Sequence, residues 1–216
     1  MTPLRVEARL IGGICLPHGP IALDALLTWV EAQRRELPPP ASAGDCTDLP
    51  IPLAQERGIW LASFGAYEIE ESERDWTNRR FPLPEAQDLG GPKLKRVMLS
   101  AGPSKSYRLP RERMHLVDDR IAWWAIGDVD AVRIMLAEVS YLGKRRGVGL
   151  GRVRQWTVEA CASWDGFPVL RDGAPLRSLP LDWPGVSSDA ERAYAVLRPP
   201  YWDNARRVEA YVPRAA

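Results

Sequence analysis

One segment of this chain concentrates glycine and positive charge more strongly than any other. Residues 143–152 have the sequence GKRRGVGLGR, so four glycines and four cations occupy ten positions. Glycine tolerates positive φ angles, and successive backbone N–H groups in such a turn can form a concave site for phosphate oxygens. We therefore predict an anion-binding loop, with an ordinary surface turn as the alternative. The residues that carry this prediction are Gly143, Lys144, Arg145, Arg146, Gly147, Gly149, Gly151 and Arg152.

The residues on either side of this glycine loop predict its place between a helix and a strand. Residues 128–141 carry apolar side chains at three- and four-residue spacing behind Asp128, which can cap the first turn. Residues 153–161 have the pattern of a strand. Phosphate loops of nucleotide-binding proteins have the opposite order, strand before helix, and the motif G-x-x-x-x-G-K followed by Ser or Thr is absent. We therefore expect no nucleotide cofactor.

Positive charge is concentrated around the glycine loop, although the whole chain carries a formal net charge of only +1. Residues 93–154 carry +8, whereas residues 1–92 carry −6 and residues 155–216 carry −1. A basic region of this kind is typical of a surface that neutralises the phosphates of a nucleic acid. The alternative is a solvated charged loop.

The composition is that of a globular protein. The chain has 216 residues, of which 45% are hydrophobic, enough to form a core in one large domain. The longest apolar runs, such as residues 10–16, are far too short to span a membrane. Three cysteines without a C-x-x-C pair indicate neither a disulfide framework nor a zinc site. We therefore expect a cytoplasmic protein with no membrane anchor, no metal and no other cofactor.

The periodicity of the chain predicts an α+β domain over residues 1–161. Helices are predicted from Pro20 to about Arg35 and at 128–141, and strands are predicted at residues 4–16, 60–69, 121–126 and 153–161. This order matches a ferredoxin-like (RRM-like) βαββαβ core. Such a core packs two helices on one face of a four-stranded antiparallel sheet and leaves the other face available for binding.

Two further segments are attached to this core. Residues from about 70 to 119 form an insertion, in which we expect a β-hairpin of residues 95–99 and 106–109. Its basic side chains would form a thumb that contacts nucleic acid. The residues assigned to this contact are Lys93, Lys95, Arg96, Lys105, Tyr107, Arg108, Arg111, Arg113 and His115. Residues 162–216 are rich in Pro, Trp and Arg, and we expect them to wrap around the domain as an extension.

A ferredoxin-like core with a basic glycine-rich loop before its last strand resembles the RAMP superfamily of CRISPR-associated RNA-binding proteins. Residues 23–27 (LDALL), 121–124 (IAWW) and 141–153 (YLGKRRGVGLGRV) are similar to the small subunit of type IV effector complexes, which caps the 5′ handle of the CRISPR RNA (crRNA). The resemblance implies a non-catalytic RNA-binding subunit in crRNA-guided antiviral defence. Its implied partners are the crRNA and the backbone and large subunits of the complex. Contact with target double-stranded DNA next to the protospacer-adjacent motif (PAM) stays open.

Two other functions stay open at this point. His18 lies between the first predicted strand and the first predicted helix, where RNA-processing relatives place a general base. A metal-independent endoribonuclease that processes CRISPR repeat RNA is therefore one alternative. A ferredoxin-like protein-interaction module without nucleic acid is the other.

Aromatic side chains raise a separate question, because they can stack on bases or fill a core. Strand alternation sends Trp123 and Trp124 to opposite faces of the sheet, so at most one of them can face RNA. The same alternation places Trp156 on one face with Arg152 and Arg154. We therefore predict that these three residues contact RNA, with Trp156 stacking on a base.

Overall fold

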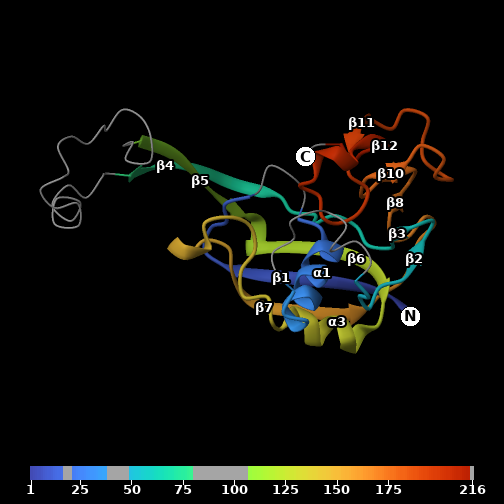
Figure 1. Cartoon of the computed structure of the whole chain (residues 1–216), viewed down its shortest axis with the longest axis horizontal. Helices are drawn as coiled ribbons and strands as arrows, with labels where there is room; N and C mark the ends of the chain where they lie inside the picture. The colour runs from blue at the N-terminus through green and yellow to red at the C-terminus, as the bar shows by residue number, and fades with distance from the viewer. Residues whose placement is uncertain (17–20, 38–48, 80–106, 215–216) are drawn as a thin grey trace, which may run out of the picture. The chain divides into compact units, whose positions relative to one another are not determined.

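The computed structural model has an α+β fold with mostly antiparallel sheets and few helices (Figure 1). It describes residues 1–16, 21–37, 49–79 and 107–214. The chain divides into two compact units. The larger comprises Met1–Glu71 and Met114–Ala216, and the smaller comprises Ser72–Arg113. The smaller unit therefore contains most of the predicted insertion.

A three-stranded antiparallel sheet forms the centre of the larger unit, in the order β6-β1-β7. Its strands are β1 (Thr2–Ile11), β6 (Arg120–Gly127) and β7 (Arg152–Ala160). The side chains of β1 alternate between the core and the second face of the sheet, so Leu4 and Val6 are fully buried. The strands predicted at 121–126 and 153–161 are therefore present, and the first predicted strand, 4–16, is present but ends at Ile11, directly before Gly12, whose φ angle is 72°.

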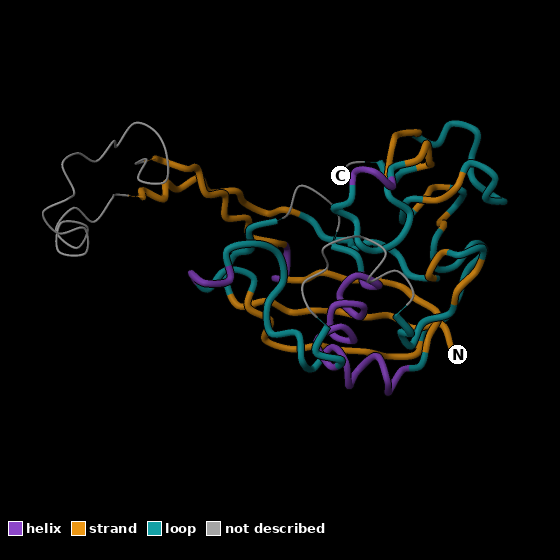
Figure 2. The backbone as a smooth tube through the Cα atoms, in the orientation of Figure 1, coloured by secondary structure: helices purple, strands orange, loops and turns teal. Residues whose placement is uncertain are grey.

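Two helices, α1 (Leu23–Arg34) and α3 (Val129–Leu136), pack against one face of this sheet (Figure 2). Their apolar side chains join those of the strands in one core cluster, and burial of each large apolar side chain contributes about 1.5–3 kcal/mol. Asp128 caps α3 as predicted, because its Oδ1 accepts a hydrogen bond from the N–H of Ala131 at 2.8 Å.

Both helices differ from the predicted ranges at one end. The first residue of α1 is Leu23, and Pro20 lies outside the described residues. α3 ends at Leu136 rather than near Tyr141. The chain leaves this helix early because the next residues pair with the start of β7. The carbonyl oxygen of Ser140 accepts a hydrogen bond from the N–H of Val153 at 2.9 Å, and Tyr141 forms a β-bridge with Arg152.

The strand predicted at residues 60–69 is interrupted. It is preceded by a short hairpin of β2 (Gln55–Glu56) and β3 (Ile59–Trp60). After this hairpin, single antiparallel bridges connect Ala62 and Ala66 to β6. Between these two bridges, the N–H groups of Phe64 and Gly65 donate away from β6, to the carbonyl oxygens of Leu176 and Ile21 at 2.8 and 2.9 Å. The segment therefore runs antiparallel along β6 without a continuous ladder.

The acidic and basic parts of the insertion pair with each other in the smaller unit and in the few residues on either side of it. β4 (Ile69–Arg79) and β5 (Tyr107–Leu116) form a two-stranded sheet. Opposite charges meet across it, with 2.7 Å between Arg74 and Glu112 and 3.5 Å between Arg113 and Glu73. The predicted strand at 95–99 lies outside the described residues. The acidic strand β4 as the partner of β5 was not predicted.

The C-terminal residues pack with the central sheet in the same compact unit. They form a second apolar cluster around Leu179 and Trp183. Their short strands are β8 (Leu170–Arg171), β9 (Ala174–Pro175), β10 (Leu179–Pro180), β11 (Arg192–Ala195) and β12 (Val208–Tyr211). The ring of Trp164 contacts that of Trp124 on the second face of the sheet, with 5.8 Å between centroids. The prediction that this face is left available for binding is therefore wrong for this part of it.

A buried charged network connects the extension to α1. The guanidinium group of Arg177 is fully buried and lies 3.2 Å from Oδ2 of Asp24. The hydroxyl of Tyr201 donates to the same Oδ2 at 2.7 Å and accepts from Arg177 at 2.8 Å. The carbonyl oxygens of Ala62 and Leu197 accept further hydrogen bonds from Arg177, at 3.0 and 2.7 Å. This network holds the extension on the core.

Candidate nucleic-acid interface

The glycine loop (residues 143–152) joins α3 to β7, as predicted, and is fixed at its base by backbone hydrogen bonds. The N–H of Lys144 donates to the carbonyl oxygen of Cys15 at 2.7 Å. The N–H of Gly151 donates to the carbonyl oxygen of Gly13 at 3.0 Å. Both ends of the loop are therefore held beside the residues that follow β1.

Three of the four glycines in the loop adopt the positive φ angles that the sequence predicts. The φ angles of Gly143, Gly149 and Gly151 are 72°, 84° and 70°. At Gly151 a Cβ atom would overlap the carbonyl oxygen of Leu142, so a larger residue does not fit without a shift of the backbone. The prediction is wrong for Gly147, which has an ordinary φ angle and open space around it.

The left-handed conformation that Gly147 lacks occurs instead at Arg145, whose φ angle is 65°. Arg145 directly precedes the 3₁₀ turn η4 (Arg146–Val148). A left-handed residue before a helical turn points successive N–H groups to one side. Among the residues that the structure describes, the N–H groups of Arg145, Arg146 and Gly147 donate to no acceptor. Three successive N–H donors at the start of η4 are therefore available to an anion, whereas the N–H groups of Lys144, Val148, Gly149 and Gly151 are already bonded within the protein.

The cations of the glycine loop are exposed to solvent. They are Lys144, Arg145, Arg146 and Arg152. Within the described ranges none of them forms an ion pair. Other arginines of the larger unit have carboxylate partners, such as Arg34, which lies 2.6 Å from Glu138. Adjacent cations without counter-ions produce a positive potential that attracts an anion.

A β-bulge at the start of β7 separates side chains that strand alternation had placed together. The register between β1 and β7 shifts after Arg9, so β7 accommodates one extra residue. Arg152 is paired with Ile11, whose side chain lies on the second face of the sheet. Trp156 is paired with Ala8, which faces the core. The two side chains therefore lie on opposite faces.

Trp156 is part of the core in this arrangement. Its Nε1–H donates to the carbonyl oxygen of Val139 at 2.9 Å, and its ring centroid lies 5.7 Å from that of Trp123. The predicted placement of Trp156 on one face with Arg152 and Arg154 is wrong. Arg154 itself is exposed.

The insertion residues assigned to the interface are only partly within the described residues. Arg113 pairs with Glu73 at 3.5 Å, a partner that was not predicted, and His115 on β5 is half-buried. Only the backbone is described for Tyr107, Arg108 and Arg111, all on β5. The residues that lie outside the described part are Lys93, Lys95, Arg96, Lys105 and the candidate general base His18.

Two cations that sequence analysis did not assign to the interface lie near the start of β7. Arg9 and Arg120 are directly opposite each other in the register of β1 and β6, on the second face of the sheet. The outward direction of Arg9 follows from the alternation in β1. Its position opposite Arg120 does not, because strand register is not visible in one sequence.

A further concave feature is a pocket of about 570 Å³, lined by the C-terminal extension together with Glu56 and Leu61. Its lining includes the rings of Trp164 and Trp183 and the carboxyl groups of Glu56, Asp165 and Asp172. These three carboxylates outnumber the cation in the lining, Arg171, and disfavour a phosphate ligand there. In the described parts of the chain, no group of three or more His, Cys, Asp or Glu side chains could hold a metal ion. No described helix is long and apolar enough to cross a membrane.

Comparison with protein families gives a match that spans almost the whole chain. Residues 2–213 match the model of the family described as CRISPR type IV associated protein Csf3. No curated protein matches the chain. The match includes the central sheet, the glycine loop and the C-terminal extension, so it does not depend on a single motif. The chain belongs to the family of the CRISPR type IV associated protein Csf3.

Proposed function

We propose that this chain is a non-catalytic RNA-binding subunit of a type IV CRISPR effector complex, in which it holds the 5′ handle of the crRNA. The observation that carries the proposal is the glycine loop, whose four cations are exposed and without ion pairs in the described part of the chain. Next to them, the N–H groups at residues 145–147 are available as hydrogen-bond donors. Cations and backbone donors together suit a phosphodiester backbone.

The proposal includes a ferredoxin-like core of the RAMP type. In its support, the strands lie in the order β7, β1, β6, followed by the segment of residues 62–66, with antiparallel pairing throughout. This is the fourth-first-third-second order expected of a βαββαβ chain. The two helices on one face are also those of such a core. The interrupted second strand is a departure from the regular pattern.

The geometry of the loop favours binding over chemistry. RNA cleavage without a metal requires a general base near the 2′-hydroxyl, which is supplied by a histidine or a carboxylate in many enzymes. Residues 143–152 contain no His, Asp or Glu. The loop can therefore hold a phosphate but contributes no proton acceptor of these kinds. Its partners in the complex would be the backbone and large subunits, with target DNA next to the PAM as a further contact.

A binding experiment tests this proposal. A variant with Lys144→Ala, Arg145→Ala and Arg146→Ala should bind a synthetic crRNA more weakly, and the slope of log affinity against log salt should fall by about 0.7 for each lost phosphate contact. The control is the triple alanine variant of Arg192, Arg207 and Arg214, which removes the same charge from the extension. Equal affinity and slope in the loop variant and the wild type would refute the proposal.

Two further measurements separate the alternative functions. Incubation of the protein with repeat RNA and no divalent metal should leave the RNA intact. Cleavage that is abolished by His18→Ala would instead establish the endoribonuclease. If the wild-type protein does not bind RNA at moderate salt, the protein-interaction module is the remaining alternative.

A further inference from the structure

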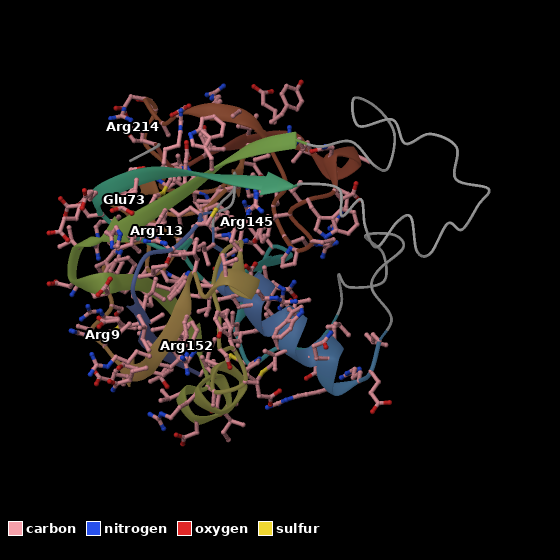
Figure 3. All side chains as sticks on the ribbon, turned by 90° about the vertical axis from the view of Figure 1, so that its left-hand side faces the viewer. Arg9, Glu73, Arg113, Arg145, Arg152 and Arg214 are labelled. Carbon is pink, nitrogen blue, oxygen red and sulfur yellow. The ribbon has the colours of Figure 1, made fainter. Side chains whose placement is uncertain are left out.

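The second face of the central sheet carries three cations at the end nearest the glycine loop. We call Arg9, Arg120 and Arg152 the sheet-end cluster. Arg9 and Arg120 are cross-strand partners in the register of β1 and β6. Arg152 is paired with Ile11, two residues further along β1 and on the same face as Arg9. Arg9 and Arg152 lie on the side of the molecule that Figure 3 turns toward the viewer.

Direct opposition of two arginines is unfavourable for the free protein. Side chains directly opposite in antiparallel strands have Cβ atoms about 4.5–5.5 Å apart, and like charges at such positions destabilise the sheet. Among the described residues, one carboxylate lies close enough to an arginine of this pair to reduce the repulsion between them. Glu7 lies 3.4 Å from Arg9, but it also pairs with Arg5, at 2.8 Å. Arg120 and Arg152 form no ion pair among the described residues.

Two acidic residues directly precede Arg120 in the chain. Asp118 and Asp119 precede Arg120 in the 3₁₀ turn η3 (Val117–Asp119). In the part of the chain that the structure describes, neither forms an ion pair with a member of the cluster. The ring contacts by which the C-terminal extension covers the second face are made at Trp124, further along β6. Arg9 and Arg152 are exposed and Arg120 is half-buried, and among the described residues the only carboxylate paired with the cluster is the shared Glu7.

We propose that the sheet-end cluster is a second phosphate-binding site, which receives nucleotides of the crRNA adjacent to those held by the glycine loop. This inference rests on the proposed function. Arg152 is both the last residue of the loop and the first residue of β7, so the two sites are joined without a gap in the chain. An RNA phosphate between Arg9 and Arg120 would supply the missing counter-charge. The β-bulge is essential to this path, because it turns Arg152 to the second face.

The experiment compares the double variant Arg9→Gln/Arg120→Gln with the loop triple variant and with a control, Arg207→Gln/Arg214→Gln, which removes the same charge from the extension. The probe is the synthetic crRNA, titrated at several salt concentrations. The sheet variant should weaken binding and reduce the salt slope by about 1.4, or about 0.7 per contact. The control should bind like the wild type.

The free protein gives an independent readout. Arg120→Gln should raise the melting temperature at low salt by up to about 4 °C, because it removes one of two opposed like charges. The rise should disappear at high salt, where the repulsion is screened. A lower melting temperature at low salt would overturn the like-charge argument.

The possible binding outcomes are distinguishable. Weaker binding by both the loop variant and the sheet variant supports both proposals. Weaker binding by the loop variant alone overturns the sheet-end site and leaves the proposed function standing. Wild-type binding by both variants overturns both. A sheet variant that binds crRNA normally but no longer assembles with its partner subunits would identify the cluster as a protein interface, and would also overturn this inference.

Discussion

The buried network around Asp24 gives the sharpest prediction about stability: Asp24→Ala should lower the free energy of unfolding by about 3 kcal/mol. Asp24 is 1% exposed and Arg177 is 0% exposed, so loss of the carboxylate leaves a guanidinium group in the interior without its counter-charge. Removal of one partner of a buried ion pair costs about 3–5 kcal/mol. We expect the lower end because the carbonyl oxygens of Ala62 and Leu197 still accept hydrogen bonds from Arg177.

Urea unfolding followed by tryptophan fluorescence measures this free energy directly. The melting temperature should fall by about 6–12 °C, since 1 kcal/mol shifts a chain of this size by about 2–4 °C. Asp189→Ala is the control, because Asp189 pairs with Arg214 at 3.1 Å on the exposed surface, where solvent and salt screen the ion pair. A loss for Asp24→Ala as small as that of the control would refute the reasoning. Asp24→Leu/Arg177→Met should regain much of the stability, because it removes the buried charge altogether.

Two further predictions concern single positions. Gly151→Ala should destabilise the fold by more than about 1 kcal/mol, because its φ angle is 70° and a Cβ atom would overlap a carbonyl oxygen. Gly147→Ala should be neutral or slightly stabilising. Thermal unfolding of both variants measures the difference, and equal effects would contradict the prediction. Burial raises the pKa of Tyr201 well above 10, although the nearby Arg177 charge opposes this rise. The free energy of unfolding should therefore be insensitive to this group below about pH 10, the pKa of an unfolded tyrosine, and should fall above it. Tyr201→Phe should be less stable near neutrality but lose less stability above about pH 10 in urea titrations, and a parallel decline in both proteins would argue against the assignment.

Much of the central sheet could be predicted because its strands alternate strictly. Leu4 and Val6 face the core, and Trp123 and Trp124 lie on opposite faces, as period-two alternation requires. The α3 cap at Asp128 was predictable because a cap depends only on residues within one helical turn. Predictions based on alternation fail where backbone pairing interrupts the period. The bulge after Arg9 is such a case, and its signal depends on the register of two distant strands.

The candidate site shows the same division between local and long-range information. Three of the four glycine conformations follow from the sequence, since few other residues adopt φ angles near 70°. A positive φ angle was also predicted for Gly147, but Arg145 adopts that conformation instead. The 3₁₀ turn that begins after Arg145 has no periodic pattern by which the sequence could have predicted it. The register that sets Arg9 opposite Arg120 and the ion pair between Asp24 and Arg177 bring together residues far apart in the chain. Neither leaves a trace in composition or spacing.

The network at Asp24 also bears on the order in which this protein can fold during its synthesis. Asp24 is translated early, but Arg177 follows 153 positions later and Tyr201 follows 177 positions later. At about 5–20 residues per second, the carboxylate waits about 8–30 s for its counter-charge. A nascent chain that ends before Arg177 would have to keep this carboxylate hydrated, which opposes closure of the core around α1. Two residues that are translated long after α1, Arg177 and Tyr201, therefore complete the interior in which Asp24 lies.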